Sequence, residues 1–93
     1  MNEQSEHLID TTLARIEAAI ARHHAGEAEP LSSALLQIIS NEIRQVRAEW
    51  PLRAVGYGRF IIDWPDNSEI RSDLIDAAYE MERARQKDAK RIA

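Results

Sequence analysis

The 93-residue chain is long enough for one domain, which we expect over residues 1–93, and its lack of cysteine excludes disulfides, thiolate metal sites and cysteine nucleophiles. Hydrophobic residues make up 44% and aromatics only 5%, so alanine, isoleucine and leucine must form most of the core, which favours helices packed on helices. The formal net charge of −4 argues against nucleic-acid binding, which needs clustered lysine and arginine, and fits a basic protein partner better.

Residues 5–25 are predicted to form the first helix. Ile9, Leu13 and Ile16 recur at steps of four and three residues, which places them on one face. Ser5 is placed to cap the start of this helix, and Gly26 can adopt the left-handed conformation that often follows a helix end.

The second helix is predicted over residues 30–49, with Pro30 in its first turn and Pro51 just beyond its end. The short loop before it predicts an antiparallel hairpin with the first helix. Its apolar stripe is wider than one neighbour can cover, so a third element must pack on it. The next segment, the last helix or a second copy of the chain could do so. Because the third helix has a thin apolar stripe of its own, a homodimer is among the expectations. The apolar residues are Leu31, Leu35, Leu36, Ile38, Ile39, Ile43, Val46 and Trp50.

Residues 50–66, called the connector below, hold four of the five aromatic residues. Alternation of apolar and polar residues near its end predicts a short strand or hairpin, whereas its two glycines favour an irregular arm, and the sequence leaves both open. Trp50, Phe60 and Trp64 are expected to close the open end of the helical hairpin, with a place in a contact surface as the alternative. Tyr57, which stands between the two glycines, is expected to be exposed.

The third helix is predicted over residues 67–88, capped either by Asp66 paired with Glu69 or by Ser68. Its apolar stripe is thinner than the other two, and the polar turns that follow are expected to extend beyond the core or to fray. The stripe consists of Ile70, Leu74, Ala77, Met81 and Ala84, with Ile75, Ala78 and Tyr79 beside it.

Charge on the third helix supplies the main candidate for a contact surface. Five carboxylates recur at steps of three and four residues and form one acidic stripe. Such a stripe is common on a solvated helix face whose charges suit the helix dipole, but it can also steer a basic partner. With three residues of the connector it makes up the predicted partner-binding set: Asp66, Glu69, Asp73, Asp76, Glu80, Tyr57, Arg53 and Arg59.

Catalytic and metal-binding patterns are not evident. No nucleophile elbow, phosphate-binding loop or dinucleotide fingerprint occurs. His23 and His24 are adjacent, so on a helix they point about 100° apart and cannot readily share an ion. We therefore expect no enzyme activity, no cofactor and no metal.

The sequence predicts an all-α fold: a helical hairpin, an aromatic connector and a third helix. Small size, acidity and the lack of cysteine are shared with bacterial immunity proteins, antitoxins and phage-encoded inhibitors. We therefore expect an interaction protein that neutralises or regulates a basic partner; the alternative is a structural subunit that forms a helical homo-oligomer. No apolar run is long enough to span a membrane and no signal core begins the chain, so we expect a cytoplasmic protein without membrane contact.

Overall fold

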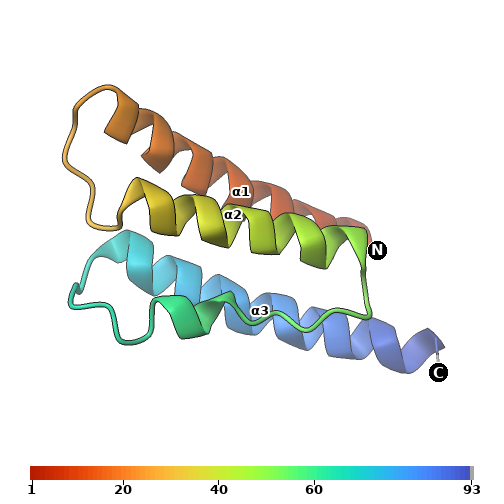
Figure 1. Ribbon diagram of the computed structural model, residues 1–93. Helices are drawn as coiled ribbons and strands as arrows, with labels where there is room; N and C mark the ends of the chain where they lie inside the picture. Colours follow the sequence, from red (N-terminus) through yellow and green to blue (C-terminus); the bar gives the residue numbers. More distant parts are fainter. Residues whose placement is uncertain (93) are drawn as a thin grey trace.

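The computed structural model describes residues 1–92, with the backbone alone for Ile92, so the prediction for the last residue lies outside the described part. The described residues form helices and turns and contain no strand, which confirms the all-α prediction and excludes the strand or hairpin considered for the connector. The elements, shown in Figure 1, are α1 (Glu3–His24), α2 (Ser33–Ala48), the short 3-10 helix η1 (Tyr57–Phe60) and α3 (Glu69–Ile92).

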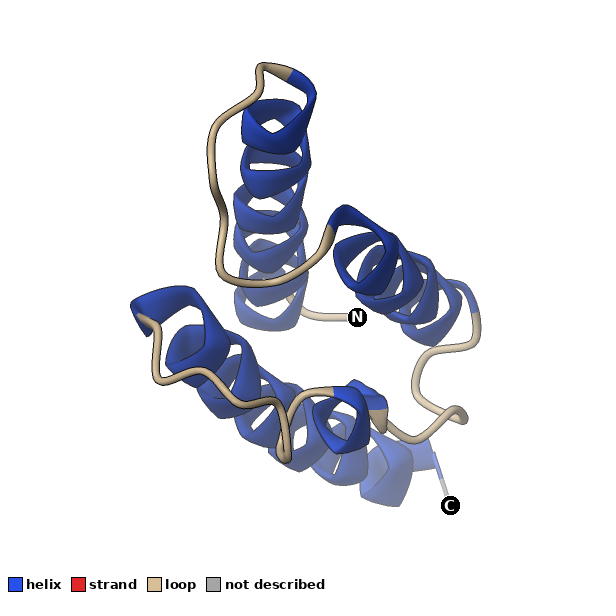
Figure 2. Ribbon diagram, turned by 60° about the vertical axis from the view of Figure 1, so that its left-hand side comes forward, coloured by secondary structure: helices blue, strands red, loops and turns tan. Residues whose placement is uncertain are grey.

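The chain passes along the length of the molecule four times in alternating directions (Figure 1). α1 and α2 make the first two passes, the connector the third and α3 the fourth. α1 and α2 form the predicted antiparallel hairpin, and the connector then returns beside α3 (Figures 1 and 2). α1 packs against α2 and α3, and η1 also packs against α2 and α3. Simple four-helix bundles use the same up-down-up-down order, with a helix where this chain has its connector. Three helices and the connector thus enclose the core from four sides.

The start of α1 differs slightly from the prediction. The side chain of Asn2, rather than that of Ser5, caps the helix and accepts a hydrogen bond from the Ser5 backbone N–H at 2.8 Å. At the other end Gly26 has φ 82°, and the N–H of Glu27 bonds the Arg22 carbonyl at 2.9 Å, which is the Schellman arrangement. The predicted role of Gly26 is confirmed.

α2 begins later than predicted because Ser32 caps it, accepting a hydrogen bond from the Leu35 N–H at 3.1 Å. Pro30 therefore lies in the loop, and Leu31 turns into the core with no exposed surface. The imidazole Nε2 of His23 donates to the Leu31 carbonyl oxygen at 2.6 Å, which ties the loop to the last turn of α1.

α3 begins at Glu69, and Ser68 is its cap, since the Ser68 hydroxyl accepts a hydrogen bond from the Arg71 N–H at 3.3 Å. Asp66 accepts from the Ser68 N–H at 3.0 Å and so shapes the turn before the helix. The helix continues to Ile92, four residues past the predicted end. The polar last turns are helical and extend past the core.

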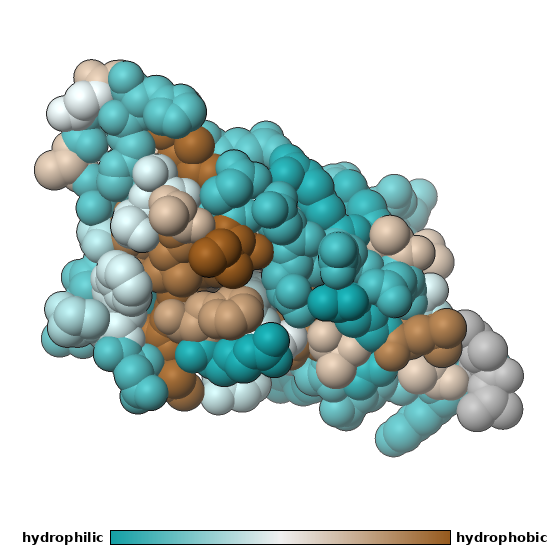
Figure 3. Space-filling model, in the orientation of Figure 1, coloured by the Kyte–Doolittle hydropathy of each residue, from teal (hydrophilic) through white to brown (hydrophobic). Residues whose placement is uncertain are grey.

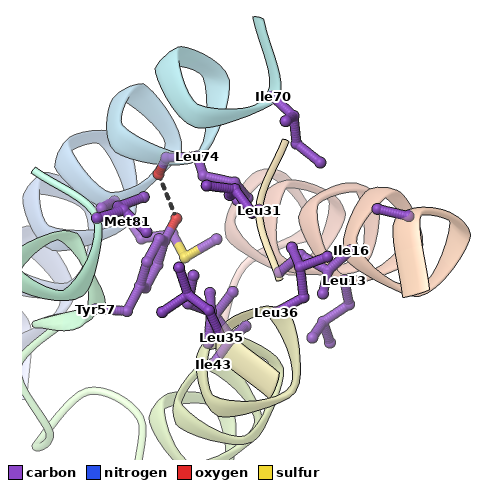
Figure 4. Packing of buried hydrophobic residues seen from close by; sticks show 14 of the residues in the cluster. Leu13, Ile16, Leu31, Leu35, Leu36, Ile43, Tyr57, Ile70, Leu74 and Met81 are labelled. Atoms are coloured by element: carbon purple, nitrogen blue, oxygen red, sulfur yellow. Dashed lines mark hydrogen bonds between the residues drawn. The ribbon is translucent and has the colours of Figure 1, made fainter. Parts of the chain in front are cut away.

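The core consists of aliphatic side chains from all three helices with Tyr57 among them (Figure 4). η1 packs on α2 and covers part of its surplus apolar surface, which was one of the three solutions that the sequence left open, whereas Ile38 of α2 stays exposed. Trp50, Phe60 and Trp64 are partly buried against this cluster, as predicted. Fully buried members include Ile9, Ile16, Leu31, Leu36, Ile39, Ile43, Val46, Ile61, Leu74 and Met81.

Candidate functional site

Tyr57 is buried, which contradicts the expectation that it would be exposed. Its side chain has no exposed surface, and its hydroxyl donates to the Leu74 carbonyl oxygen at 2.7 Å (Figure 4). The 3-10 turn points the ring inward, where it supplies the bulk that the alanine-rich helices lack. Burial raises the pKa of the phenol, so the group stays neutral. Tyr57 is therefore a core residue and leaves the set of candidate contact residues.

The connector is fastened to the C-terminal half of α3 through Glu82. One carboxylate oxygen of Glu82 accepts hydrogen bonds from the Val55 N–H at 2.9 Å and from Nε of Arg85 at 2.8 Å. Arg85 in turn donates to the Pro51 carbonyl oxygen at 3.0 Å. The hydrogen bonds from Arg85, followed by those from Val55 and Gln86, lower the pKa of Glu82 to about 2.

A third attachment lies one turn further along α3. The indole N–H of Trp50 donates to Asp88 at 2.9 Å. Glu82, Arg85 and Asp88 recur every three residues, and we call them the connector-facing side of α3. Their partners lie in the reverse order along the connector, because the connector runs antiparallel to the helix (Figure 1).

The two connector arginines differ in how much of their charge is engaged. Arg53 is half-buried and pairs with Glu49 at 3.0 Å and with Glu42 at 3.4 Å, so its charge is balanced within the chain. Arg59 is exposed, and its guanidinium lies 4.8 Å from the centre of the Phe60 ring, within cation–π distance. A Cβ atom at Gly56 would lie 2.8 Å from Nη1 of Arg59, so glycine leaves room for this arrangement.

The acidic stripe on α3 is divided by the fold. Asp66 is half-buried in the turn before the helix, and Asp73 forms an ion pair with Arg15 of α1 at 2.7 Å. Among the described residues, the other three carboxylates make no ion pair and are exposed to solvent. We call these three the acidic face of α3: Glu69, Asp76 and Glu80.

An open groove of about 420 Å³ lies between the connector and α3, and we call it the connector groove. Its lining is mostly aliphatic side chains and glycine backbone, with Arg59 on the connector side and Tyr79 on the α3 side. The other lining residues are Val55, Gly56, Gly58, Ile62, Ile75, Ala78 and Glu82. The carboxylate of Glu82 is engaged by Val55 and Arg85.

Tyr79 joins the connector groove to the acidic face. Its side chain is 62% exposed, and it lines both the groove and an adjoining polar depression that contains Asp76, Glu80 and Arg83. Glu82, which is paired with Arg85, also lines this depression. The two carboxylates of the acidic face against the one arginine leave it with excess negative charge. The candidate set drawn from the sequence did not include Tyr79, although its place beside the apolar stripe indicated that it could lie at the edge of the core.

Other exposed apolar side chains lie outside the groove. Ile38 on α2 is 50% exposed, and Leu52 in the connector is 81% exposed. The space-filling view shows apolar surface between α2 and the connector, toward the end of the molecule that carries the α1–α2 loop (Figure 3). Monomeric domains expose single apolar residues routinely, so only their grouping is informative.

A second groove, of about 530 Å³, separates the start of α1 from the last turns of α3. Its charged residues are of both signs and include Glu80, Arg83 and Lys87. Within residues 1–92 no cluster of three or more potential metal ligands occurs. None of the helices described is both long and apolar enough to cross a membrane.

Comparison with known proteins gives no match: no family model fits the chain, and no curated protein or solved structure is significantly similar to it. The surface described above is therefore the basis for inferring a function.

Proposed function

We propose that this chain is a non-enzymatic interaction module of the cytoplasm that binds a basic protein through the acidic face of α3. The observation that carries the proposal is the contrast in pairing along one helix. Glu69, Asp76 and Glu80 make no ion pair among the described residues, whereas Asp73, Glu82 and Asp88 are engaged with other parts of the chain.

Keeping like charges together has a cost in stability. Carboxylates three or four residues apart on a helix repel one another by about 0.2–0.5 kcal/mol per pair. Asp76 has two such neighbours, Asp73 and Glu80. A basic partner would remove this repulsion on binding, and the negative field would chiefly raise its association rate.

Neutralisation or regulation of that partner, as immunity proteins, antitoxins and phage inhibitors perform it, is the outcome we propose for binding. An acidic surface that covers a basic active or nucleic-acid-binding site would compete with the substrate of that site. An acidic face with an apolar groove beside it supports this proposal, because protein interfaces commonly combine an apolar centre with a polar rim.

A charge-reversal experiment tests the proposal. Proteins recovered by the tagged wild-type chain from lysate of the source cells are compared with those recovered by Asp76→Lys/Glu80→Lys. The control, Glu6→Lys/Glu27→Lys, changes the net charge equally at exposed positions away from α3. A basic protein lost only with the α3 variant, and released by salt, supports the proposal; equal recovery by both variants contradicts it.

Self-assembly is the second candidate, and the exposed Ile38 on α2 is the observation that favours it. In this case the apolar surface between α2 and the connector would bury against another copy of the chain (Figure 3). Native mass at high micromolar concentration separates the two functions. A dimer that becomes a monomer in Ile38→Lys supports assembly, and a monomeric wild type excludes it.

A further inference from the structure

We propose that the connector groove receives an apolar side chain from a segment of the basic partner, while lysine or arginine residues of the same segment lie on the acidic face of α3. This inference rests on the proposed function and adds to it the chemistry of the docking segment: an apolar anchor next to a basic run.

The lining of the groove suits an apolar anchor. Val55, Ile62, Ile75 and Ala78 contribute aliphatic surface. Gly58 brings the connector close to α3, since a Cβ atom there would lie 3.9 Å from Cβ of Ala78. The volume of about 420 Å³ lies at the small end of the range for ligand pockets and would hold one or two large side chains.

Two large side chains at the rim would become buried when the groove is filled. Ile62 is 51% exposed and Tyr79 is 62% exposed. Covering such surface contributes roughly 25 cal/mol per Å² of apolar area removed from water. Tyrosine is also among the residues that most often dominate binding energy at interfaces.

The negative charge beside the groove determines which kind of apolar segment is favoured as its occupant. A second copy of this chain carries a net charge of −4 and would meet the acidic face with repulsion. The polar depression that shares Tyr79 with the groove has excess negative charge, so a segment that crosses Tyr79 would be favoured if it were basic. The structure therefore favours a basic segment of another protein over a second copy.

The groove is held open by bonds within the chain. The connector wall is fixed to α3 through the Val55 N–H, which donates to Glu82, and through the Pro51 carbonyl, which accepts from Arg85. On the opposite side the connector packs against α2 through η1. A wall fixed on both sides loses little conformational entropy when a ligand binds.

Peptide titrations followed by amide chemical shifts test the proposal. The probes are three short synthetic peptides: adjacent leucines followed by lysines, the same peptide with serines for the leucines, and the same peptide with glutamates for the lysines. The leucine–lysine peptide should shift the amides of Gly56 and Gly58 together with those of Asp76 and Glu80. The serine–lysine peptide should shift only the latter two, and the leucine–glutamate peptide neither pair.

A matched pair of variants identifies the groove as the site. Ile62→Lys places a repelling charge at the groove, whereas Leu52→Lys puts a lysine in place of an exposed apolar residue of the connector that lies outside it. We expect Ile62→Lys to weaken binding of the leucine–lysine peptide at least about tenfold, and Leu52→Lys to change it less than about twofold. Equal effects of the two changes would overturn the assignment.

The remaining outcomes separate this inference from the function on which it rests. If both lysine peptides shift Asp76 and Glu80 while Gly56 and Gly58 stay unmoved, the groove is not the docking site and the acidic face remains one. If neither lysine peptide moves Asp76 or Glu80, the acidic face fails as well. If the groove amides shift with protein concentration alone, the occupant is a second copy and the inference is wrong.

Discussion

α3 carries charged residues on two of its sides, and the two sets differ in what they contact. On the connector-facing side Glu82, Arg85 and Asp88 each bond part of the connector. On the acidic face Glu69, Asp76 and Glu80 make no ion pair with any described residue. Periodicity shows that charges share a face, but only the path of the rest of the chain shows whether they hold the fold together or remain available to a partner.

Replacing each of the two tyrosines should give the largest difference in the free energy of unfolding, because Tyr57 of the connector faces the core and Tyr79 of α3 faces solvent. Tyr57→Ala removes the one aromatic ring that is fully buried, together with its hydrogen bond to Leu74, and should lower the free energy of unfolding by about 3–5 kcal/mol. Tyr79→Ala removes an exposed ring and should change it by less than about 0.5 kcal/mol. Urea denaturation measures both, and similar losses would contradict the assigned positions.

Replacing each of two glutamates on different sides of α3 should give the next largest difference in stability. Glu82→Ala leaves the Val55 N–H and the Arg85 guanidinium without their partner and should cost about 2 kcal/mol of stability. Glu80→Ala, two residues away, serves as the control and should be neutral within about 0.5 kcal/mol. Thermal melts would show the difference as a fall of roughly 10 °C for Glu82→Ala alone. If both variants melt together, Glu82 does not fasten the connector.

The stability of the chain at low pH should also report on the bonds that Glu82 makes to the connector. Because the pKa of Glu82 is about 2 in the folded chain and about 4.5 without these partners, the unfolded state binds the proton more readily. Stability should therefore fall as the pH drops from about 4.5 toward 2. After discounting for solvent screening, we expect a loss of about 1 kcal/mol from this group. Denaturation at several pH values should show that loss in the wild type and less of it in Glu82→Gln.

The smallest effect should have the opposite sign and lies on the acidic face. Asp76→Lys removes the repulsion from Asp73 and Glu80 and should stabilise the chain by about 0.5 kcal/mol. The same change should weaken binding of the leucine–lysine peptide, so stability and binding would move in opposite directions. Chemical denaturation and a peptide titration on one sample measure both. A loss of stability would show that Asp76 contributes to the fold in a way that the structure does not record.

Much of the fold could be predicted from the apolar periodicity of the three helices, because each stripe recurs over several turns. Ile9, Leu13 and Ile16, for example, are all buried as expected. The predicted ends of the helices were less accurate. Asn2 and Ser32 cap two of the helices, and the choice of cap depends on local side-chain geometry.

The connector could not be predicted because its conformation is set by partners distant in the sequence. Its glycines permit many backbone angles, and its path is fixed by bonds to residues of α3, among them Glu82, Arg85 and Asp88. This path places Tyr57 in the core, whereas Tyr79 is exposed on α3. The candidate site consequently no longer includes Tyr57 and now includes the boundary between the connector and α3. Of the five acidic residues named from the sequence, Glu69, Asp76 and Glu80 remain part of it, whereas Asp73 is paired with Arg15 and Asp66 lies in the turn before the helix.

η1 has one side on α2 and another on α3, so the connector is at once a wall of the core and a wall of the groove. Any occupant of the groove that binds only the folded chain therefore adds its binding free energy to that of folding, about 2.7 kcal/mol at a ligand concentration one hundred times its Kd. The melting temperature thereby becomes an assay for the partner: fractions or peptides that raise it can be ranked before any interface is mapped.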